Sequence, residues 1–227
     1  MNSDYEQTTD GQAWLRALKT NQLRYPSEFV VRWLSRVRRE LPKECNALDM
    51  GFGAGQHLKL FMEFGLRAWG TELLNDAINM GEQVLHGQPL AGKLIKGDLD
   101  HPDLPAQGFG AFLSWGSLFL KPVDGIRESL QRIATLLQPH GRALFNLRTH
   151  DNWFYGLGVE NPPKHWVLDK RAGPYSGGRY TFFLNEDEVR DLISGTGLEI
   201  ENIERTDWWQ NQLSERHSWW VVQAVRQ

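Results

Sequence analysis

The sequence predicts an α/β fold in which a mostly parallel sheet is covered by helices on both faces. Short apolar runs alternate with amphipathic, helix-length runs from residue 45 to residue 147, an order typical of parallel sheets. Near the carboxyl end, the run WWVVQAV at residues 219–225 is apolar nearly throughout. Such a run is typical of a strand that is buried on both faces.

The first 44 residues are expected to form a tail and helices that cap the sheet. Residues 1 to 10 are polar and acidic and are expected to be loose. Residues 11–20 carry apolar side chains at helical spacing, which predicts a helix. Ser27 can cap a second helix, which Pro42 ends.

Residues 45–227 are expected to form one domain. We expect strands at residues 45–50, 67–71, 93–96, 109–114, 142–147, 198–203 and 219–225. We expect helices at residues 56–64, 74–85, 125–137 and 185–194. Residues 149–179 break this rhythm and are rich in glycine, proline and aromatic residues. We interpret them as a lid or substrate loop inserted after the fifth strand.

Composition limits the classes of partner and the compartment. The net charge of −3 argues against duplex nucleic acid as the main partner. Cys45 is the single cysteine, so no intrachain disulfide can form and a reducing compartment is expected. The polar start is unlike a secretory signal, and no apolar stretch is long enough to span a membrane. We therefore expect a cytoplasmic protein with no membrane partner.

Three glycines at alternate positions follow the first expected strand. Gly51, Gly53 and Gly55 permit a tight turn and let a ligand approach bare backbone. The helix that follows turns its amide groups and positive dipole end toward such a ligand. A dinucleotide fingerprint would need glycine or alanine at position 56, where this chain has Gln56. The spacing therefore argues against a pyrophosphate on this turn.

The pattern D-x-G-x-G-x-G at residues 49–55 resembles motif I of the class I S-adenosylmethionine-dependent methyltransferases. Later segments resemble the same family in order: WGTE at 69–72, GDL at 97–99, residues 109–115, LLQPHGR at 136–142, and FFLNEDEVRDLI at 182–193 before Gly197 and Leu198. Gly110 departs from the family, in which an acid is common at this position. The resemblance covers residues 45–147 and 180–227.

The resemblance implies a Rossmann-like three-layer sandwich with seven strands in the order 3-2-1-4-5-7-6, the seventh antiparallel. It also implies S-adenosyl-L-methionine as cofactor and S-adenosylhomocysteine as product. Glu72 would accept the ribose hydroxyls, and Asp98 would meet the adenine amino group. The expected cofactor-binding residues are Asp49, Gly51, Phe52, Gly53, Gly55, Glu72, Leu73, Asp98, Leu99, Ser114 and Trp115. No metal is expected.

A methyltransferase needs a general base only when its acceptor holds its proton firmly. His150, directly after the fifth strand, is the first candidate for this base, and His165 in the insert is the second. Tyr25 is a candidate to close over the cofactor, and Trp115 and Trp153 could stack on adenine or substrate.

Three functions stay open. The first is methyl transfer to a small molecule such as a sugar, a sugar nucleotide or another metabolite, which an acidic protein with a glycine- and aromatic-rich insert favours. The second is methyl transfer to tRNA or protein, which predicts a basic binding face. A cluster of arginines could provide it: Arg32, Arg36, Arg38 and Arg39. The third is a non-catalytic cofactor-binding protein that stabilises a partner. The ten tryptophans, some of them paired, would then form an interface and also allow a homodimer.

Overall fold

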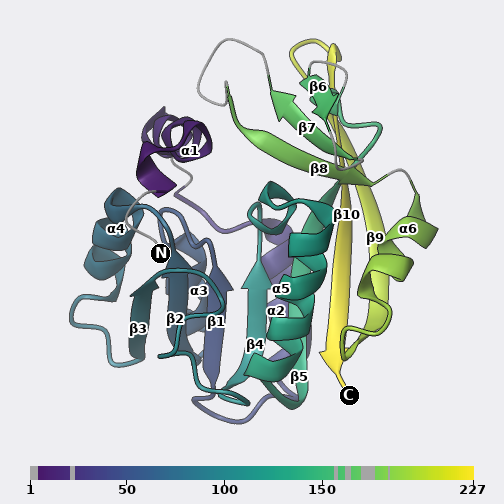
Figure 1. Cartoon of the computed structure of the whole chain (residues 1–227). Helices are drawn as coiled ribbons and strands as arrows, with labels where there is room; N and C mark the ends of the chain where they lie inside the picture. The colour runs from purple at the N-terminus through teal and green to yellow at the C-terminus, as the bar shows by residue number, and fades with distance from the viewer. Residues whose placement is uncertain (1–4, 21–23, 156–157, 162–164, 170–176, 184) are drawn as a thin grey trace.

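The computed structural model has the three-layer α/β fold that the sequence predicts (Figure 1). It describes residues 5–20, 24–155, 158–161, 165–169, 177–183 and 185–227. The helical elements are η1 (Tyr5–Gln7), α1 (Thr9–Thr20), α2 (Glu28–Val37), α3 (Gln56–Glu63), α4 (Asn75–Leu85), η2 (Leu118–Leu120), α5 (Val123–Leu136) and α6 (Glu186–Ile193). The strands are β1 (Asn46–Met50), β2 (Arg67–Glu72), β3 (Ala91–Lys96), β4 (Phe109–Ser114), β5 (Leu137–Thr149), β6 (Gly158–Asn161), β7 (Trp166–Asp169), β8 (Arg179–Phe183), β9 (Leu198–Gln210) and β10 (Glu215–Arg226).

The main sheet has the strand order that the resemblance implies. Its strands run β3-β2-β1-β4-β5, and β10 then pairs with β5 and with β9. Strands β1 to β5 pair in parallel, whereas β10 is antiparallel to both of its neighbours. Because β9 and β10 are the expected strands six and seven, the predicted order 3-2-1-4-5-7-6 is confirmed. The carboxyl ends of the parallel strands therefore share one edge, where ligands of such sheets bind.

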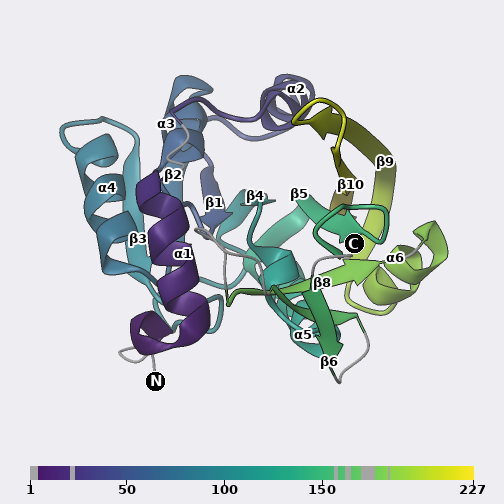
Figure 2. The same cartoon turned by 90° about the horizontal axis from the view of Figure 1, so that it is seen from above.

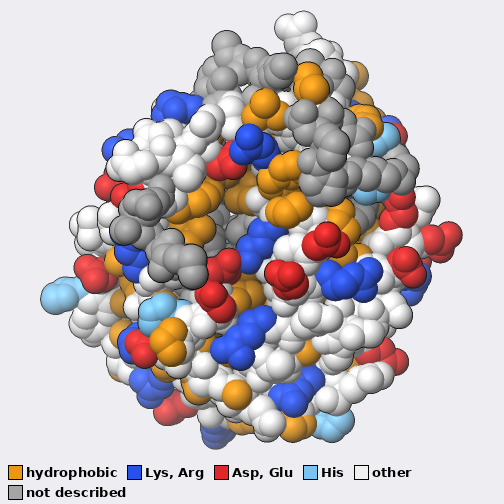
Figure 3. All heavy atoms as spheres, in the orientation of Figure 1, with side chains coloured by type: hydrophobic (Ala, Val, Ile, Leu, Met, Phe, Trp, Pro, Cys, Tyr) orange, Lys and Arg blue, Asp and Glu red, His pale blue; other side chains and the backbone are white. Residues whose placement is uncertain are grey.

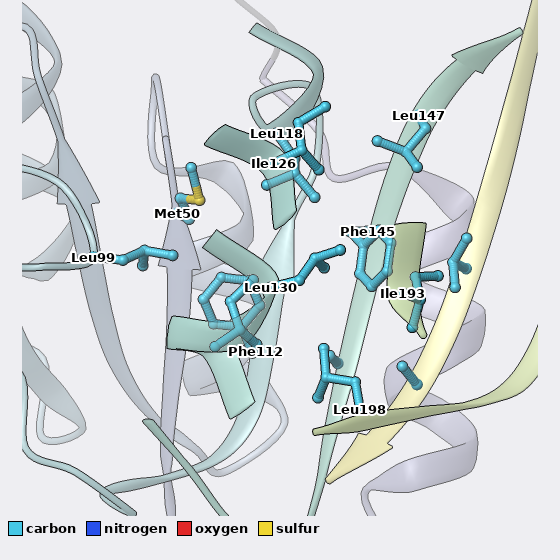
Figure 4. Packing of buried hydrophobic residues seen from close by; sticks show 14 of the residues in the cluster. Met50, Leu99, Phe112, Leu118, Ile126, Leu130, Phe145, Leu147, Ile193 and Leu198 are labelled. Atoms are coloured by element: carbon cyan, nitrogen blue, oxygen red, sulfur yellow. The ribbon is translucent and has the colours of Figure 1, made fainter. Parts of the chain in front are cut away.

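The sheet separates two apolar cores. On one face, Leu113 and Leu144 pack with side chains from α2 and α3. On the other, Phe112 and Phe145 pack with side chains from α5 and α6, and Figure 4 shows these side chains pointing toward one another. Successive residues of β4 and β5 therefore enter opposite cores, which explains why these central strands are apolar without alternation.

The insert after β5 contains strands, contrary to the expectation of a loop at residues 149–179. β6 and β7 form an antiparallel pair, and β8 is antiparallel to β7. β8 also joins the main sheet, because Arg148 and Thr149 at the end of β5 pair in parallel with residues 182 and 183. The pairing of β8 with β5 joins segments that are distant in the chain, so local apolar alternation could not predict it.

The amino-terminal segment is more ordered than the loose tail that the sequence predicts. The Thr8 hydroxyl accepts from the Gly11 amide at 3.0 Å, so it caps α1. α1 then reaches the insert: Asp10 pairs with Arg179 of β8 at 2.9 Å, and Trp14 lies edge-on to Tyr180 with 6.1 Å between ring centroids. Figures 1 and 2 show α1 and β8 beside each other above the sheet. No helix in the described part of the chain has the length and apolar character to cross a membrane.

Candidate functional site

The glycine loop joins β1 to α3 at the ligand-binding edge of the sheet. Gly51, Gly53 and Gly55 have φ values of +70°, +54° and +83°, a left-handed conformation that disfavours other residues. A Cβ atom at Gly51 would lie 2.6 Å from Cβ of Ser117, whereas one at Gly53 would meet no described protein atom within 4 Å. The loop is therefore packed tightly at its first glycine and open at its second.

Glu72 at the end of β2 holds the glycine loop in place. Its carboxylate accepts hydrogen bonds from the amides of Gly53 at 3.1 Å, Leu73 at 2.7 Å and Leu74 at 3.3 Å. Burial raises the pKa of Glu72 above its ordinary value, and these three hydrogen bonds oppose that shift. A carboxylate has about four acceptor positions, so Glu72 keeps capacity for a ligand hydroxyl.

Asp49 is a buried acid beneath the glycine loop. It is 1% exposed, and its Oδ2 has no hydrogen-bond partner among the described residues. The Nδ1 atom of His57 is 3.7 Å from that oxygen, and His57 Nε2 accepts from the Ser27 amide at 3.3 Å. Burial raises the pKa of Asp49, and His57 opposes the shift. Oδ2 of Asp49 can therefore accept a hydrogen bond from a ligand.

Asp98 follows β3 and is held by two donors. The Leu99 amide donates to its Oδ1 at 2.8 Å, and Lys121 Nζ donates to its Oδ2 at 2.6 Å. Lys121 also donates to the Ser129 hydroxyl at 2.8 Å. The sequence did not point to Lys121, which lies between η2 and α5 and meets Asp98 only in the folded protein.

The loop after β4 is tied to both neighbouring strands. Ser117 donates to the Met50 carbonyl at 2.6 Å and lies 2.9 Å from the Ser114 hydroxyl. The Gly116 amide donates to Asn146 Oδ1 of β5 at 2.7 Å. Trp115, between them, stacks on Phe29 of α2 with 5.7 Å between centroids. The sequence analysis missed Asn146, which looks like an ordinary residue of a buried strand.

Phe52 and Leu99 contribute little side-chain surface to a ligand. Phe52 is 2% exposed and fills the space at two glycines: a Cβ atom at Gly70 or Gly81 would lie 2.4 or 2.7 Å from its ring. Leu99 is also 2% exposed and belongs to the core beside α5. Only the backbone of these two residues is suited to meet a cofactor.

The two expected bases lie in different surroundings. His150 directly follows β5 and packs on Tyr155, with 3.6 Å between ring centroids. His165 lies beside Glu188 of α6, with 3.5 Å between Nε2 and Oε1. Figure 1 shows α6 next to β9, at the opposite end of the sheet from β1 to β3. Of the two, His150 is thus the one at the ligand-binding edge.

Tyr5, rather than Tyr25, covers the end of β2. Tyr25 is 83% exposed, whereas burial raises the pKa of Tyr5, and the nearby carboxylates of Asp10 and Glu72 raise it further. Glu6 next to it accepts a hydrogen bond from Nδ2 of Asn75 at 2.9 Å, at the start of α4. The sequence analysis treated this segment as a tail, since no periodic pattern marks it.

Comparison with known proteins agrees with this geometry. Residues 47–141 match a protein family described as a methyltransferase domain. These residues therefore belong to a methyltransferase domain. The resemblance of the glycine motif to the class I S-adenosylmethionine-dependent methyltransferases is thereby confirmed, and so is S-adenosylmethionine as the cofactor. No curated protein sequence matches the chain.

Solved structures of methyltransferases share the fold at low sequence identity. A methyltransferase from Methanosarcina mazei has 14% identity and a TM-score of 0.67, with 89% of this chain and 98% of that chain covered. The 1,6-didemethyltoxoflavin N1-methyltransferase of Burkholderia thailandensis, solved with its substrate and S-adenosylhomocysteine, has 16% identity and a TM-score of 0.67, covering 98% and 86%. A methyltransferase from Clostridium acetobutylicum has 14% identity and a TM-score of 0.66, covering 94% and 96%.

Proposed function

We propose that this methyltransferase acts on a small-molecule acceptor and holds its donor between the glycine loop, Glu72 and Asp49. The observation that carries the proposal is that three features lie at one edge of the sheet. Gly53 has free space beside its Cα atom, Glu72 accepts from the amide of the glycine loop, and one buried oxygen of Asp49 has no described hydrogen-bond partner. A nucleoside with an amino-acid arm presents the hydroxyl and ammonium donors that such acids accept.

In this arrangement each residue has a separate task. The Gly53 region gives access to backbone, Asp49 faces the ammonium group, and Glu72 receives the ribose hydroxyls. Asp98 is assigned to the adenine amino group, with Lys121 holding its carboxylate. When bound between these residues, S-adenosylmethionine would supply an activated methyl group on positively charged sulfur for the acceptor nucleophile. The protein positions the reactants and excludes water.

The cover over the edge supports a small acceptor. α1 and β8 contact each other through Asp10–Arg179 and Trp14–Tyr180. Figure 3 shows a hollow in the upper half of this face, lined largely by hydrophobic side chains. We therefore propose that residues 1–44 cap the domain of residues 45–227 and that the insert completes the acceptor pocket. The toxoflavin methyltransferase, which has the same fold, binds a small ring compound.

The basic cluster on α2 gives little support to a nucleic-acid acceptor. Arg38 donates to the Leu41 carbonyl at 3.2 Å and also to the Phe64 carbonyl. Arg32 lies over the Phe29 ring at 4.6 Å and 3.8 Å from Glu204. Two of the four arginines thus make contacts within the protein, so the cluster does not form a continuous basic face.

His150 is proposed as the base where the acceptor must lose a proton. It stands at the end of β5, beyond Asn146 and Arg148 on the same strand. The imidazole of a histidine can take a proton from a hydroxyl or amine.

Calorimetry with S-adenosylhomocysteine, followed by transfer of a labelled methyl group, tests the proposed function. We expect saturable binding of the product cofactor and label transfer into a low-molecular-weight fraction of a cell extract. Transfer into tRNA or protein alone, lost when Arg36 and Arg39 are replaced, would contradict a small acceptor. Absence of binding by folded protein would contradict the cofactor site itself.

Alanine at two glycines is expected to separate folding from binding. At Gly53, alanine should cost the roughly 1–2 kcal/mol of left-handed backbone strain, and it should weaken binding of S-adenosylhomocysteine by about tenfold or more because the methyl enters the space open to a ligand. At Gly51, the methyl would also strike Ser117, so the melting temperature should fall further. Thermal unfolding and calorimetry check both variants.

Gly87→Ala is the matched control. Gly87 has a φ of +70° and no described protein atom within 4 Å of an added Cβ, and it lies beyond the end of α4. It therefore imposes the same backbone cost away from the site. Equal cofactor affinity in the Gly53 and Gly87 variants would count against the proposed position of the donor.

A further inference from the structure

We propose that the acceptor is a planar ring compound with hydrogen-bond-accepting atoms, such as ring carbonyls or ring nitrogens, that binds against Trp115 and Trp219 beside the Asn146 amide. This inference rests on the proposed function, because it assigns the substrate class of the same site. Aromatic rings, two buried donors and one buried cation at this edge of the sheet support the proposal.

The first observation is a group of rings at the ligand-binding edge. Trp219 of β10 lies 5.9 Å from Trp115, 5.8 Å from Phe119 and 5.6 Å from Trp208 between ring centroids. Phe119 is 1% exposed, whereas the two tryptophans at positions 115 and 219 keep accessible surface. The accessible part of these two indoles is flat surface on which a ligand ring can stack.

The group lies where the transferred methyl group would arrive. Trp115 directly follows β4, and Ser117 of the same loop bonds to the Met50 carbonyl beside the glycine loop. Trp219 is opposite Arg148 in the β5–β10 pair. The rings are therefore held next to the donor position by the backbone of β1, β4, β5 and β10.

The second observation is a pair of buried donors without acceptors among the described residues. Asn146 is 0% exposed; its Oδ1 accepts from Gly116, but its Nδ2 donates to nothing described. The indole Nε1 of Trp219 is likewise buried and unbonded. A buried donor left without an acceptor costs free energy, so a ligand acceptor atom here would be bound strongly.

These two donors face the same region. Asn146 is opposite Val221 and Trp219 is opposite Arg148, so Asn146 and Trp219 are diagonal neighbours on one face of the strand pair. Side chains in that relation have Cα atoms about 7–8 Å apart. That spacing suits two acceptor atoms on one flat ring system.

The third observation is the charge beside the rings. The guanidinium of Arg148, which is 5% exposed, lies 4.6, 4.3 and 4.4 Å from the centroids of Phe119, Phe154 and Tyr180. A cation so placed favours an electron-rich or carbonyl-bearing ring over a cationic one. A sugar has hydroxyl donors on every side, and indole rings, phenyl rings and a guanidinium group offer no acceptors for them.

Two substitutions of Trp219 test the proposal. Trp219→Phe keeps a flat ring and removes the N–H donor, whereas Trp219→Leu removes the ring. The control is Trp209→Leu on β9, since Trp209 is 48% exposed and lies next to Trp208 outside the ring group. Ligand-observed NMR would screen a panel of planar lactams and N-heterocycles, lumazine and xanthine among them, against saturated sugars and amino acids of equal size. All samples contain S-adenosylhomocysteine.

We expect binders from the planar panel, with affinity about tenfold lower in Trp219→Phe and lower still in Trp219→Leu. Affinity in Trp209→Leu should be unchanged. The proposal is overturned if no planar compound binds, if saturated compounds bind as often, or if Trp219→Leu leaves planar binding intact. Calorimetry with S-adenosylhomocysteine on each protein distinguishes failure of the proposed function from failure of this inference. If the wild type does not bind S-adenosylhomocysteine, the proposed function is wrong. If it binds S-adenosylhomocysteine but does not prefer planar over saturated compounds, only this inference is wrong.

Discussion

Replacing Glu72 with alanine is expected to weaken binding of S-adenosylhomocysteine by about 100-fold or more, because charge-assisted hydrogen bonds contribute about 1.5–3 kcal/mol each. The change removes the acceptor proposed for a ribose hydroxyl. It also leaves the amides of Gly53, Leu73 and Leu74 without the carboxylate that now accepts from them. The glycine loop should therefore lose both its ligand contact and its anchor. Isothermal titration calorimetry measures the affinity.

Two further proteins make this result specific. Glu72→Gln keeps one oxygen acceptor for the loop and should fall between alanine and the wild type. Glu63→Ala removes an exposed carboxylate on α3 whose described ion pair is a 3.9 Å contact with Lys59, and its affinity should match the wild type. If Glu72→Ala bound the ligand normally while remaining folded, Glu72 would not be the ribose-binding residue.

Replacing Asp49 with asparagine is expected to stabilise the protein and to weaken cofactor binding. Burial raises the pKa of Asp49 in the folded state. A carboxyl group shifted in this direction contributes most to stability below its ordinary pKa, and this contribution is lost as the pH rises through the folded-state pKa. The buried carboxyl group therefore makes the folded state less stable at neutral pH than at acidic pH. Neutral asparagine should raise the free energy of unfolding at pH 7 by about 1 kcal/mol.

The pH dependence gives the sharper test. The gain in melting temperature should shrink as the pH falls toward the acidic range, because wild-type Asp49 then takes up a proton. Asp103→Asn is the control: Lys93 lowers the pKa of this exposed carboxyl, so its neutralisation should bring no such gain. A gain for Asp49→Asn that is the same at every pH would contradict the assignment.

Binding should move in the opposite direction from stability. Loss of the charge that faces the ammonium group is expected to weaken S-adenosylhomocysteine binding by about tenfold to 100-fold. Calorimetry at pH 7 on the same samples checks this. A variant that is more stable and binds worse would identify Asp49 as a residue kept for function at the expense of stability.

The local sequence was sufficient for three of the five parallel strands. β4 spans Phe109–Ser114 as predicted, and β1 and β2 differ from prediction by one residue at one end. β4 is buried along its whole length, and its largely apolar run marks it as a strand. The glycine motif was equally visible, because only glycine adopts its left-handed backbone without strain.

Segments stabilised by distant partners were predicted less well. β9 continues to Gln210 and β10 begins at Glu215, well beyond their predicted ends. They pair with each other along this polar extension, from Glu204 to the turn. β8 likewise depends on the end of β5, and backbone pairing of this kind leaves no apolar pattern in the chain.

The sequence by itself determined the α/β fold, the glycine turn and the acids at the carboxyl ends of β1, β2 and β3, because each depends on residue type at a local spacing. Only the tertiary structure decided which side chains surround those acids. Lys121 on Asp98, Asn146 on Gly116 and Trp219 beside Trp115 join segments far apart in the chain. Such contacts follow from how the strands and helices pack, and no local pattern encodes that packing.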